Sequence, residues 1–250
     1  MDEDAPPVEL AQFMGTGRRF TTTRKVRFGD TDPRSRLRLD ALARLVQDAG
    51  DDDLADAGLD PLSPWVVRRT SVWAPRGWPR LGERLEVSTF CSGLGSRWGE
   101  RRTSVRSPSA VVEVAAVWIF LDQRGRPTPL AEPFLTVFTP SAGGRRTSTR
   151  LNHPGPPADA DARRWPLRAS DLDIYDHVNN SVVWMAVEDE LARHGLVPRL
   201  ADVEYHAPVD AGEEVELRSR LDGTTLRLWI TSADRVRASA LIGAVRPANG

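Results

Sequence analysis

The chain repeats itself, and this repeat constrains its fold more than any other feature of the sequence. An offset of 141 residues carries four positions of the first part onto matching positions of the second part: Asp30 onto Asp171, Asp32 onto Asp173, Leu37 onto Val178, and Asp48 onto Asp189. An offset of 130 residues carries the segment 82–87 (GERLEV) onto the segment 212–217 (GEEVEL). Because both matches come in the same order, the sequence predicts two copies of one structural unit.

The segment between the two copies has the composition of a linker. Residues 141–164 (SAGGRRTSTRLNHPGPPADADARR) are rich in Gly, Pro, Ser, Asp and Arg and offer almost nothing that a core could bury. The sequence therefore predicts an N-terminal tail at 1–19, a first domain at 20–140, the linker at 141–164, and a second domain at 165–250 that carries the candidate site. We call the two domains the first half and the second half.

Both halves show the same order of elements. In each, a strand leads to an Asp-x-Asp turn, one helix follows, and several strands come after it. Apolar residues recur at helical spacing over 39–50 and over 181–195, with Asn180 as the expected N-cap of the second helix. Strand-like runs occur at 66–73, 84–91, 97–105, 111–121, 201–206, 214–219, 224–231 and 235–245. One long helix against an antiparallel sheet in each half is an α+β architecture, and joining the sheets edge to edge would protect their edge strands.

Composition excludes several classes of function. Acidic and basic residues nearly cancel, to a net charge of −1, so no overall field favours a nucleic acid or a membrane surface as partner. The N-terminus lacks a secretory signal, and no apolar run approaches the roughly 20 residues that cross a bilayer. We therefore expect a cytoplasmic protein that binds no nucleic acid and does not insert into a membrane. Its single cysteine, Cys91, cannot form an internal disulfide.

The residues best suited to chemistry lie together just before the second helix. The stretch 171–180 (DLDIYDHVNN) gathers carboxylates, an imidazole and two amides where a helix begins. The first turn of a helix has unpaired N–H groups and a partial positive charge, so it can hold a developing oxyanion. Asp173 can supply a base or a nucleophile, and His177 can act as acid or base near neutral pH. Asn179 and Asn180 can orient substrate or water, or they can simply cap the helix.

The same stretch resembles the signature of hotdog thioesterases. In the first half, the segments WVVRRTSVW, PRLGERLEVSTF, RWGERRTSV and AAVWIFLDQRGRPTPL follow one another in an order similar to that of acyl-ACP thioesterases. The resemblance covers most of 20–245 and implies a tandem double hotdog, each half an antiparallel sheet wrapped around one long helix. It also implies a thioesterase that releases free fatty acid from acyl carrier protein (ACP) in fatty acid biosynthesis, without a cofactor.

The catalytic positions of that family fit the second half only in part. The family's Asp falls on Asp173 and its His on His177, whereas its intervening Asn falls on Tyr175. The later Glu-Cys pair of some members would fall on Pro208 and Val209 and is therefore absent. Tyr175 makes the turn similar to that of single-hotdog acyl-CoA thioesterases, in which an Asp at the position of Asp173 is the main catalytic group.

The predicted site therefore consists of two groups of residues. Asp173, His177 and Asn179 are expected to take part in catalysis, and Asn180, Tyr175 and Trp184 to bind substrate. His206 lies in an alternating strand and His153 in the linker, and no histidine and carboxylate pair has metal-ligand spacing. We expect no metal.

The first half carries a second Asp motif in different surroundings. The stretch FGDTDPRSRLRLD places Asp32 opposite the Asp of the second half, but Arg36 and Arg38 stand opposite its His and Asn. Such an arginine pair is better suited to bind a phosphate or to pair with Asp32 than to complete a hydrolytic site. We therefore expect one working site, in the second half, and a first half that shapes the acyl tunnel.

Two alternatives remain open from the sequence. One is an acyl-CoA thioesterase of the same fold. The other is a non-catalytic acyl-thioester-binding hotdog protein, favoured by the missing Asn and Glu-Cys positions, whereas the HVNN element disfavours a hotdog dehydratase. The expected partner is thus an ACP or CoA thioester, and a homodimer is also open.

Overall fold

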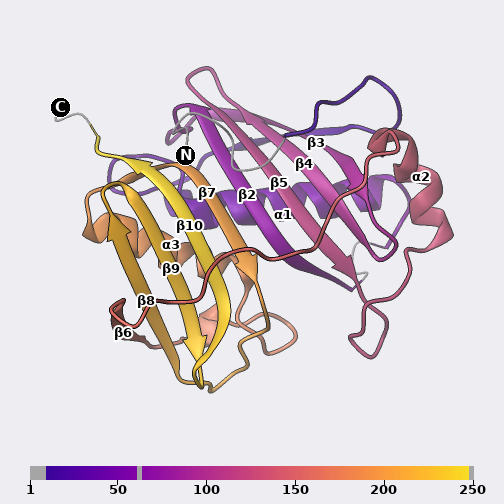
Figure 1. Cartoon of the computed structure of the whole chain (residues 1–250). Coiled ribbons are helices and arrows are strands. Elements are labelled where there is room, and N and C mark those ends of the chain that lie inside the picture. The colour runs from indigo at the N-terminus through magenta and orange to yellow at the C-terminus, as the bar shows by residue number, and fades with distance from the viewer. Residues whose placement is uncertain (1–9, 61–63, 248–250) are drawn as a thin grey trace.

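The computed structural model describes residues 10–60 and 64–247, and in them the two halves form one continuous structure (Figure 1). Residues 1–9 of the predicted tail and residues 248–250 of the second half lie outside the described residues. The elements of the first half are β1 (Phe20–Lys25), η1 (Phe28–Asp30), α1 (Leu39–Asp56), β2 (Trp65–Arg76), β3 (Arg84–Leu94), β4 (Trp98–Arg106), β5 (Val111–Phe120) and α2 (Glu132–Ala142). Those that follow are β6 (Asp161–Trp165), η2 (Ala169–Asp171), α3 (Asn180–Arg193), β7 (Val197–Tyr205), β8 (Val215–Asp222), β9 (Thr225–Ser232) and β10 (Arg235–Val245).

The strands of both halves form a single antiparallel sheet. Its order is β1-β3-β4-β5-β2-β7-β10-β9-β8-β6. The halves meet where β2 pairs with β7, from Arg69 opposite Glu204 to Trp73 opposite Leu200. Each half thus covers an edge strand of the other, as the sequence predicts, and the short β1 and β6 are the outer edges.

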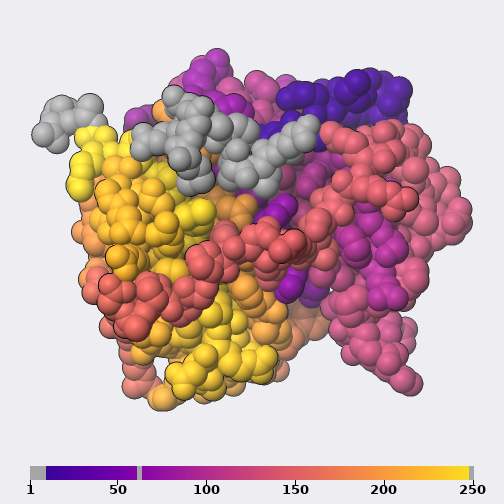
Figure 2. All heavy atoms as spheres, viewed as in Figure 1, coloured from indigo at the N-terminus to yellow at the C-terminus, as the bar shows by residue number. Residues whose placement is uncertain are grey.

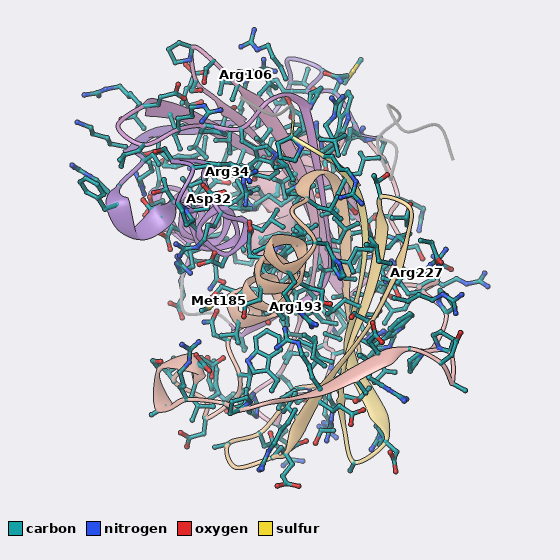
Figure 3. The ribbon with its side chains drawn as sticks, turned by 90° about the vertical axis from the view of Figure 1, so that its left-hand side faces the viewer. Asp32, Arg34, Arg106, Met185, Arg193 and Arg227 are labelled. Atoms are coloured by element: carbon teal, nitrogen blue, oxygen red, sulfur yellow. The ribbon has the colours of Figure 1, made fainter. Side chains whose placement is uncertain are left out.

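The helices α1 and α3 lie next to each other against one face of this sheet (Figures 1 and 3). Both bury the apolar stripe expected from the sequence, for example Leu42 and Val46 of α1 and Val187 and Leu191 of α3. Burying each such side chain contributes about 1.5–3 kcal/mol, so the helices are held mainly by the sheet they cover. The α+β architecture is confirmed. No helix within the described residues is both long and apolar enough to span a membrane.

The repeat is visible in the hydrogen bonds of two turns, which we call the first-half turn (residues 28–38) and the second-half turn (residues 169–179). In the first, the Asp32 N–H donates to the Arg36 carbonyl (2.9 Å); in the second, the Asp173 N–H donates to the His177 carbonyl (2.8 Å). Each turn passes through one residue with a left-handed backbone, Ser35 at φ 63° and Asp176 at φ 58°. Ser35 and Asp176 are again 141 positions apart. The duplication therefore extends to backbone conformation.

The segment 143–160 crosses the face of the sheet opposite the helices (Figures 1 and 2). It is fixed there by His153, whose Nε2 lies 3.1 Å from Oδ1 of Asp202. The buried carboxylate of Glu204 accepts the backbone N–H groups of Asn152 (2.7 Å) and His153 (3.0 Å). Although its composition resembles that of a free linker, this segment is anchored to β7.

One element, α2, was not predicted, and β6, the strand expected before the second Asp-x-Asp turn, was not located in the sequence. The helix α2 contains Pro133 and Pro140, which suggest a loop, but Pro133 lies in the first turn, where proline is tolerated. Its Phe138 is fully buried beside β3. The strand β6 lies within the predicted linker and pairs with β8, from Asp161 opposite Ser219. Because β6 is an exposed edge strand, most of its residues are charged, and the sequence therefore lacks the apolar pattern that indicates a strand.

Candidate active site

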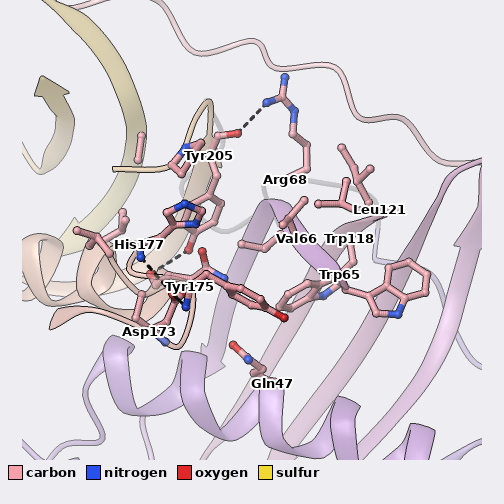
Figure 4. Close-up of a pocket in the computed structure, with 18 of the residues that line it drawn as sticks. Gln47, Trp65, Val66, Arg68, Trp118, Leu121, Asp173, Tyr175, His177 and Tyr205 are labelled. Carbon is pink, nitrogen blue, oxygen red and sulfur yellow. Dashed lines mark hydrogen bonds between the residues drawn. The ribbon is translucent and has the colours of Figure 1, made fainter. Parts of the chain in front are cut away.

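A cavity of about 810 Å³ lies between the two halves (Figure 4). Its walls come from α1, β2, β4 and β5 of the first half, and from α3, the second-half turn and the loop after β7 of the second half. The apolar lining residues include Val46, Leu54, Trp65, Val67, Trp118, Ile119, Leu121, Phe134, Val182, Val183 and Ile230. An apolar cavity of this size, with a few polar groups at one place, is typical of a site for a small molecule.

Asp173 is held at the edge of this cavity by the second-half turn (Figure 4). Its Oδ1 accepts the backbone N–H groups of Tyr175 (2.8 Å) and His177 (3.2 Å). Hydrogen bonds of this kind fix the orientation of a carboxylate. Within the described chain, no hydrogen bond reaches Oδ2, which leaves one oxygen of a half-buried carboxylate for chemistry.

His177 also lines the cavity, but its imidazole has a partner other than Asp173. Nε2 lies 3.3 Å from Oδ1 of Asp210, in the loop between β7 and β8. Asp173 is contacted by the backbone N–H of His177 instead. The sequence analysis did not identify Asp210, although it is only two positions after the residue, Pro208, on which the family's Glu falls.

The two asparagines have different positions. Asn179, not Asn180 as expected, is the N-cap of α3, and its Oδ1 accepts the N–H of Ser181 (2.9 Å). Asn180 is the first residue of the helix and lines the cavity. Within residues 10–60 and 64–247, no hydrogen bond occupies the Asn180 backbone N–H. The beginning of α3 thus presents a free donor beside Asp173, where helix geometry and dipole favour negative charge.

The two aromatic residues of the predicted substrate site also differ. Tyr175 is 61% exposed and contributes to the cavity wall. Figure 4 shows its ring extending from the turn toward Trp65 of the first half. Trp184 is only 2% exposed and packs in the core, outside the set of residues that line this cavity. Its position supports α3 rather than a direct contact with substrate.

In the first half, the corresponding turn is closed by an ion pair. Asp32 pairs with Nε of Arg36 (3.0 Å), as one reading of the sequence expected. The Arg36 guanidinium continues to Glu188 on α3 with bonds of 3.1 and 2.5 Å. Glu188 Oε1 also accepts the N–H of Leu39, the first residue of α1, at 2.6 Å. Every group that could act on a substrate there has a partner within the protein.

Two further titratable residues line the cavity in the first half. Burial, together with the neighbouring Asp48 carboxylate, raises the pKa of Asp51 to about 6. Burial raises the pKa of the Cys91 thiol to about 11. Because the thiolate is the nucleophilic form, Cys91 is inert near neutral pH and acts as a small wall residue, in agreement with its place in an alternating strand.

One cluster has the residue types of a metal site. Ligand atoms of His153, Asp202 and Glu204 lie within 4.8 Å of one another. They are far apart in sequence, so ligand spacing gave no signal for them. The cluster lies under the 143–160 segment, and its atoms fix that segment, with Ser71 as a further donor to Asp202. We interpret it as a structural clamp.

Comparisons with known proteins agree in both halves. Residues 17–134 match the acyl-ACP thioesterase N-terminal domain, and residues 156–242 match the acyl-ACP thioesterase C-terminal domain. The chain is also 30% identical over 238 residues to an uncharacterized protein of Mycobacterium tuberculosis (strain H37Rv), Rv2001. That match covers 93% of this chain and 95% of the relative.

Two solved structures share the whole double-hotdog fold. The 12:0-ACP thioesterase from Umbellularia californica superposes with a TM-score of 0.77 at 16% identity, covering 92% of this chain and 98% of the other. An acyl-ACP thioesterase from Bacteroides thetaiotaomicron gives a TM-score of 0.76 at 15% identity, covering 91% and 98%. At such identities these likenesses speak for the fold, and they confirm the tandem arrangement expected from the repeat.

Proposed function

This chain belongs to the acyl-ACP thioesterase family of thioester hydrolases, and from that premise we propose that it cleaves fatty acyl-ACP where α3 begins, with Asp173 as the central group. The observation that carries this assignment is a carboxylate with one free oxygen beside a free helix N–H, at the edge of a large apolar cavity. Thioester hydrolysis needs a base and an oxyanion donor within reach of one carbonyl group.

In the proposed reaction, Asp173, the Asn180 N–H and His177 each act in one step. Asp173 takes a proton from water, and the water oxygen attacks the carbonyl carbon of the thioester. The resulting oxyanion is stabilised by the Asn180 N–H and by the partial positive charge at the start of α3. The carbon–sulfur bond then breaks, His177 gives a proton to the leaving thiolate, and Asp210 orients the imidazole. The products are the free fatty acid and the thiol of the carrier.

The cavity suggests how the substrate is arranged. Its apolar wall continues into the first half, to Leu54, Cys91 and Phe134, so the acyl chain extends away from Asp173 into the first half. Asn179 contributes through the helix cap that positions its neighbour, and Tyr175 contacts the substrate near the turn. No metal and no cofactor enters these steps.

The biological setting follows from the same proposal. We place the protein in the cytoplasm, with ACP as the carrier partner and fatty acid biosynthesis as the process. CoA thioesters are the alternative substrates, and comparing kcat/KM for matched acyl-ACP and acyl-CoA distinguishes them. Sedimentation of the purified protein tests whether it forms a homodimer.

The test compares two equivalent substitutions. Asp173→Asn keeps the size of the side chain but removes the base, so hydrolysis of acyl-ACP should fall about 10²- to 10⁴-fold. The matched control is Asp32→Asn, which changes the corresponding residue of the first-half turn, and it should retain kcat. If Asp173→Asn hydrolyses acyl-ACP at the wild-type rate, the site assignment is wrong. If wild-type protein binds acyl-ACP without releasing thiol, the protein is a binding protein rather than a hydrolase.

A further inference from the structure

The first-half turn repeats the backbone arrangement of the proposed site but is closed by an ion pair, and it shows where a residue of α1 should act. The offset of 141 that relates Asp32 to Asp173 also relates Leu39 to Asn180, the first residues of α1 and α3. It relates Gln47 of α1 to Glu188 of α3 in the same way. No insertion interrupts the two helices between these positions.

In the closed version, the side chain from the opposite helix reaches the helix start. Glu188 belongs to α3, yet its Oε1 accepts the N–H of Leu39 at the start of α1, at 2.6 Å. An oxygen atom therefore already occupies the position at which a substrate oxyanion would bind in a working copy. Arg36 holds this carboxylate in place with two hydrogen bonds.

In the open version, the corresponding side chain is uncharged and lines the cavity. Gln47 and Asn180 both belong to the cavity wall. Figure 4 shows Gln47 on α1, with its carboxamide directed toward the turn that bears Asp173 and Tyr175. Within the described residues, neither the Gln47 side chain nor the Asn180 N–H has a hydrogen-bond partner. A carboxamide offers two N–H donors, which a carboxylate cannot.

We infer that Gln47 is a catalytic donor of this site, whose side-chain N–H joins the Asn180 N–H on the carbonyl oxygen of the thioester. This inference rests on the function proposed above and adds a residue from the first half to a site otherwise built from the second. The two copies thus differ at the start of the helix: Glu188 occupies the N–H of Leu39, whereas Gln47 leaves the N–H of Asn180 open for substrate.

Three variants test the role. Loss of one oxyanion donor typically lowers kcat about 10²- to 10³-fold, so Gln47→Ala should lower kcat within that range and raise KM by a smaller factor, because the hydrogen bond to the ground-state carbonyl is also lost. Gln47→Glu installs the arrangement of the first half, because a carboxylate competes for the Asn180 N–H and repels the oxyanion. It should therefore be slower than Gln47→Ala, although it preserves the side-chain volume. Asp48→Asn, at an exposed neighbouring position of α1, is the control and should keep wild-type kcat.

A binding measurement separates contact with substrate from packing. An ACP-bound ketone analogue, in which CH₂ replaces the sulfur, retains the carbonyl group, whereas an S-alkyl ACP lacks it. Gln47→Ala should weaken binding of the ketone and leave binding of the S-alkyl ACP unchanged. Equal losses for both ligands, or a Gln47→Glu variant faster than Gln47→Ala, would show a packing role and overturn the inference. If Asp173→Asn is inactive while all Gln47 variants keep wild-type kcat, the inference fails and the proposed function stands.

Discussion

Arg36 and Glu188 join the two halves through a buried ion pair, with the guanidinium in the first-half turn and the carboxylate on α3. Their side chains are only 9% and 10% exposed. The Arg36 guanidinium also lies 5.5 Å from the ring centre of Trp78. The Arg36–Glu188 ion pair therefore fixes the first-half turn against α3 of the second half. This contact keeps α1 and α3 in register.

Breaking this pair should destabilise the protein more than replacing both partners. Arg36→Met leaves a buried Glu188 carboxylate without its guanidinium, and such a loss costs about 3–5 kcal/mol in the free energy of unfolding. The double variant Arg36→Met/Glu188→Met leaves no unpaired charge, so it should be more stable than Arg36→Met alone. Urea denaturation of wild type, both single variants and the double variant measures the coupling. A double variant whose loss equals the sum of the single losses would contradict it.

Asp210 gives a second prediction, which concerns activity alone. Because Asp210 contacts the His177 imidazole from the loop between β7 and β8, Asp210→Asn should lower kcat about 10-fold, a small part of the roughly 10²- to 10⁴-fold that general acid–base catalysis contributes. KM and thermal stability should change little, since Asp210 is exposed. Glu214→Gln, an exposed carboxylate near the same loop, is the control. Wild-type kcat in Asp210→Asn would mean that the pair with His177 has no part in the reaction.

Much of the fold could be predicted because the sequence contains two copies of the same structural unit. The offsets of 141 and 130 residues locate the paired Asp turns and the matching strands, and the apolar stripes of 39–50 and 181–195 give the two helices. The need to cover sheet edges favoured an edge-to-edge join of the two sheets, but only the structure shows that β2 and β7 are the strands that pair. The helix α2 could not be predicted from local signals, because its two prolines suggest a loop. Its packing against β3 stabilises the helix, and that contact is not visible in the sequence.

The site was predictable only where it is local in sequence. The stretch 171–180 contains the proposed base, the helix start and the cap, and the structure places all of these at one turn. Gln47 and Asp210 come from other segments, so only the fold brings Gln47 to the cavity wall and Asp210 to His177. The assignment of the cap to Asn180 was wrong by one residue because two adjacent asparagines have equal capping propensity, and the contact with Ser181 selects Asn179.

Asp51 provides a prediction about pH. Because its pKa is raised to about 6, Asp51 keeps its proton in the folded protein up to about pH 6, whereas an Asp in an unfolded chain has a pKa of 3.8. The stability that this raised pKa contributes is thus fully present below about pH 3.8 and is lost as pH rises through 6. Asp48, Asp52 and Arg101 are the charged groups that act on it, and burial is the main cause.

The Asp51→Asn variant removes this titration. It should be more stable than wild type at pH 7.5, and the difference should disappear near pH 4, where both side chains are neutral. Melting temperatures of both proteins at several pH values measure the difference, which isolates Asp51 because all other groups are shared. Asp189→Asn, at an exposed position of α3, should show no such trend. A constant difference between pH 4 and pH 7.5 would exclude Asp51 as its source.

The length of the acyl tunnel can be altered at Gly99. This residue of β4 lies in the cavity wall of the first half, and a Cβ there would meet Leu94 at 3.5 Å and Phe134 at 3.8 Å, which are ordinary contact distances. Gly99→Val should therefore fold, but its branches should fill space that the distal end of a long acyl chain needs. We expect kcat/KM to fall for long-chain acyl-ACP and to stay near wild type for short chains. Because Gly99 belongs to the first half and not to the second-half turn, wild-type kcat/KM at every chain length would show instead that the acyl chain does not extend into the first half.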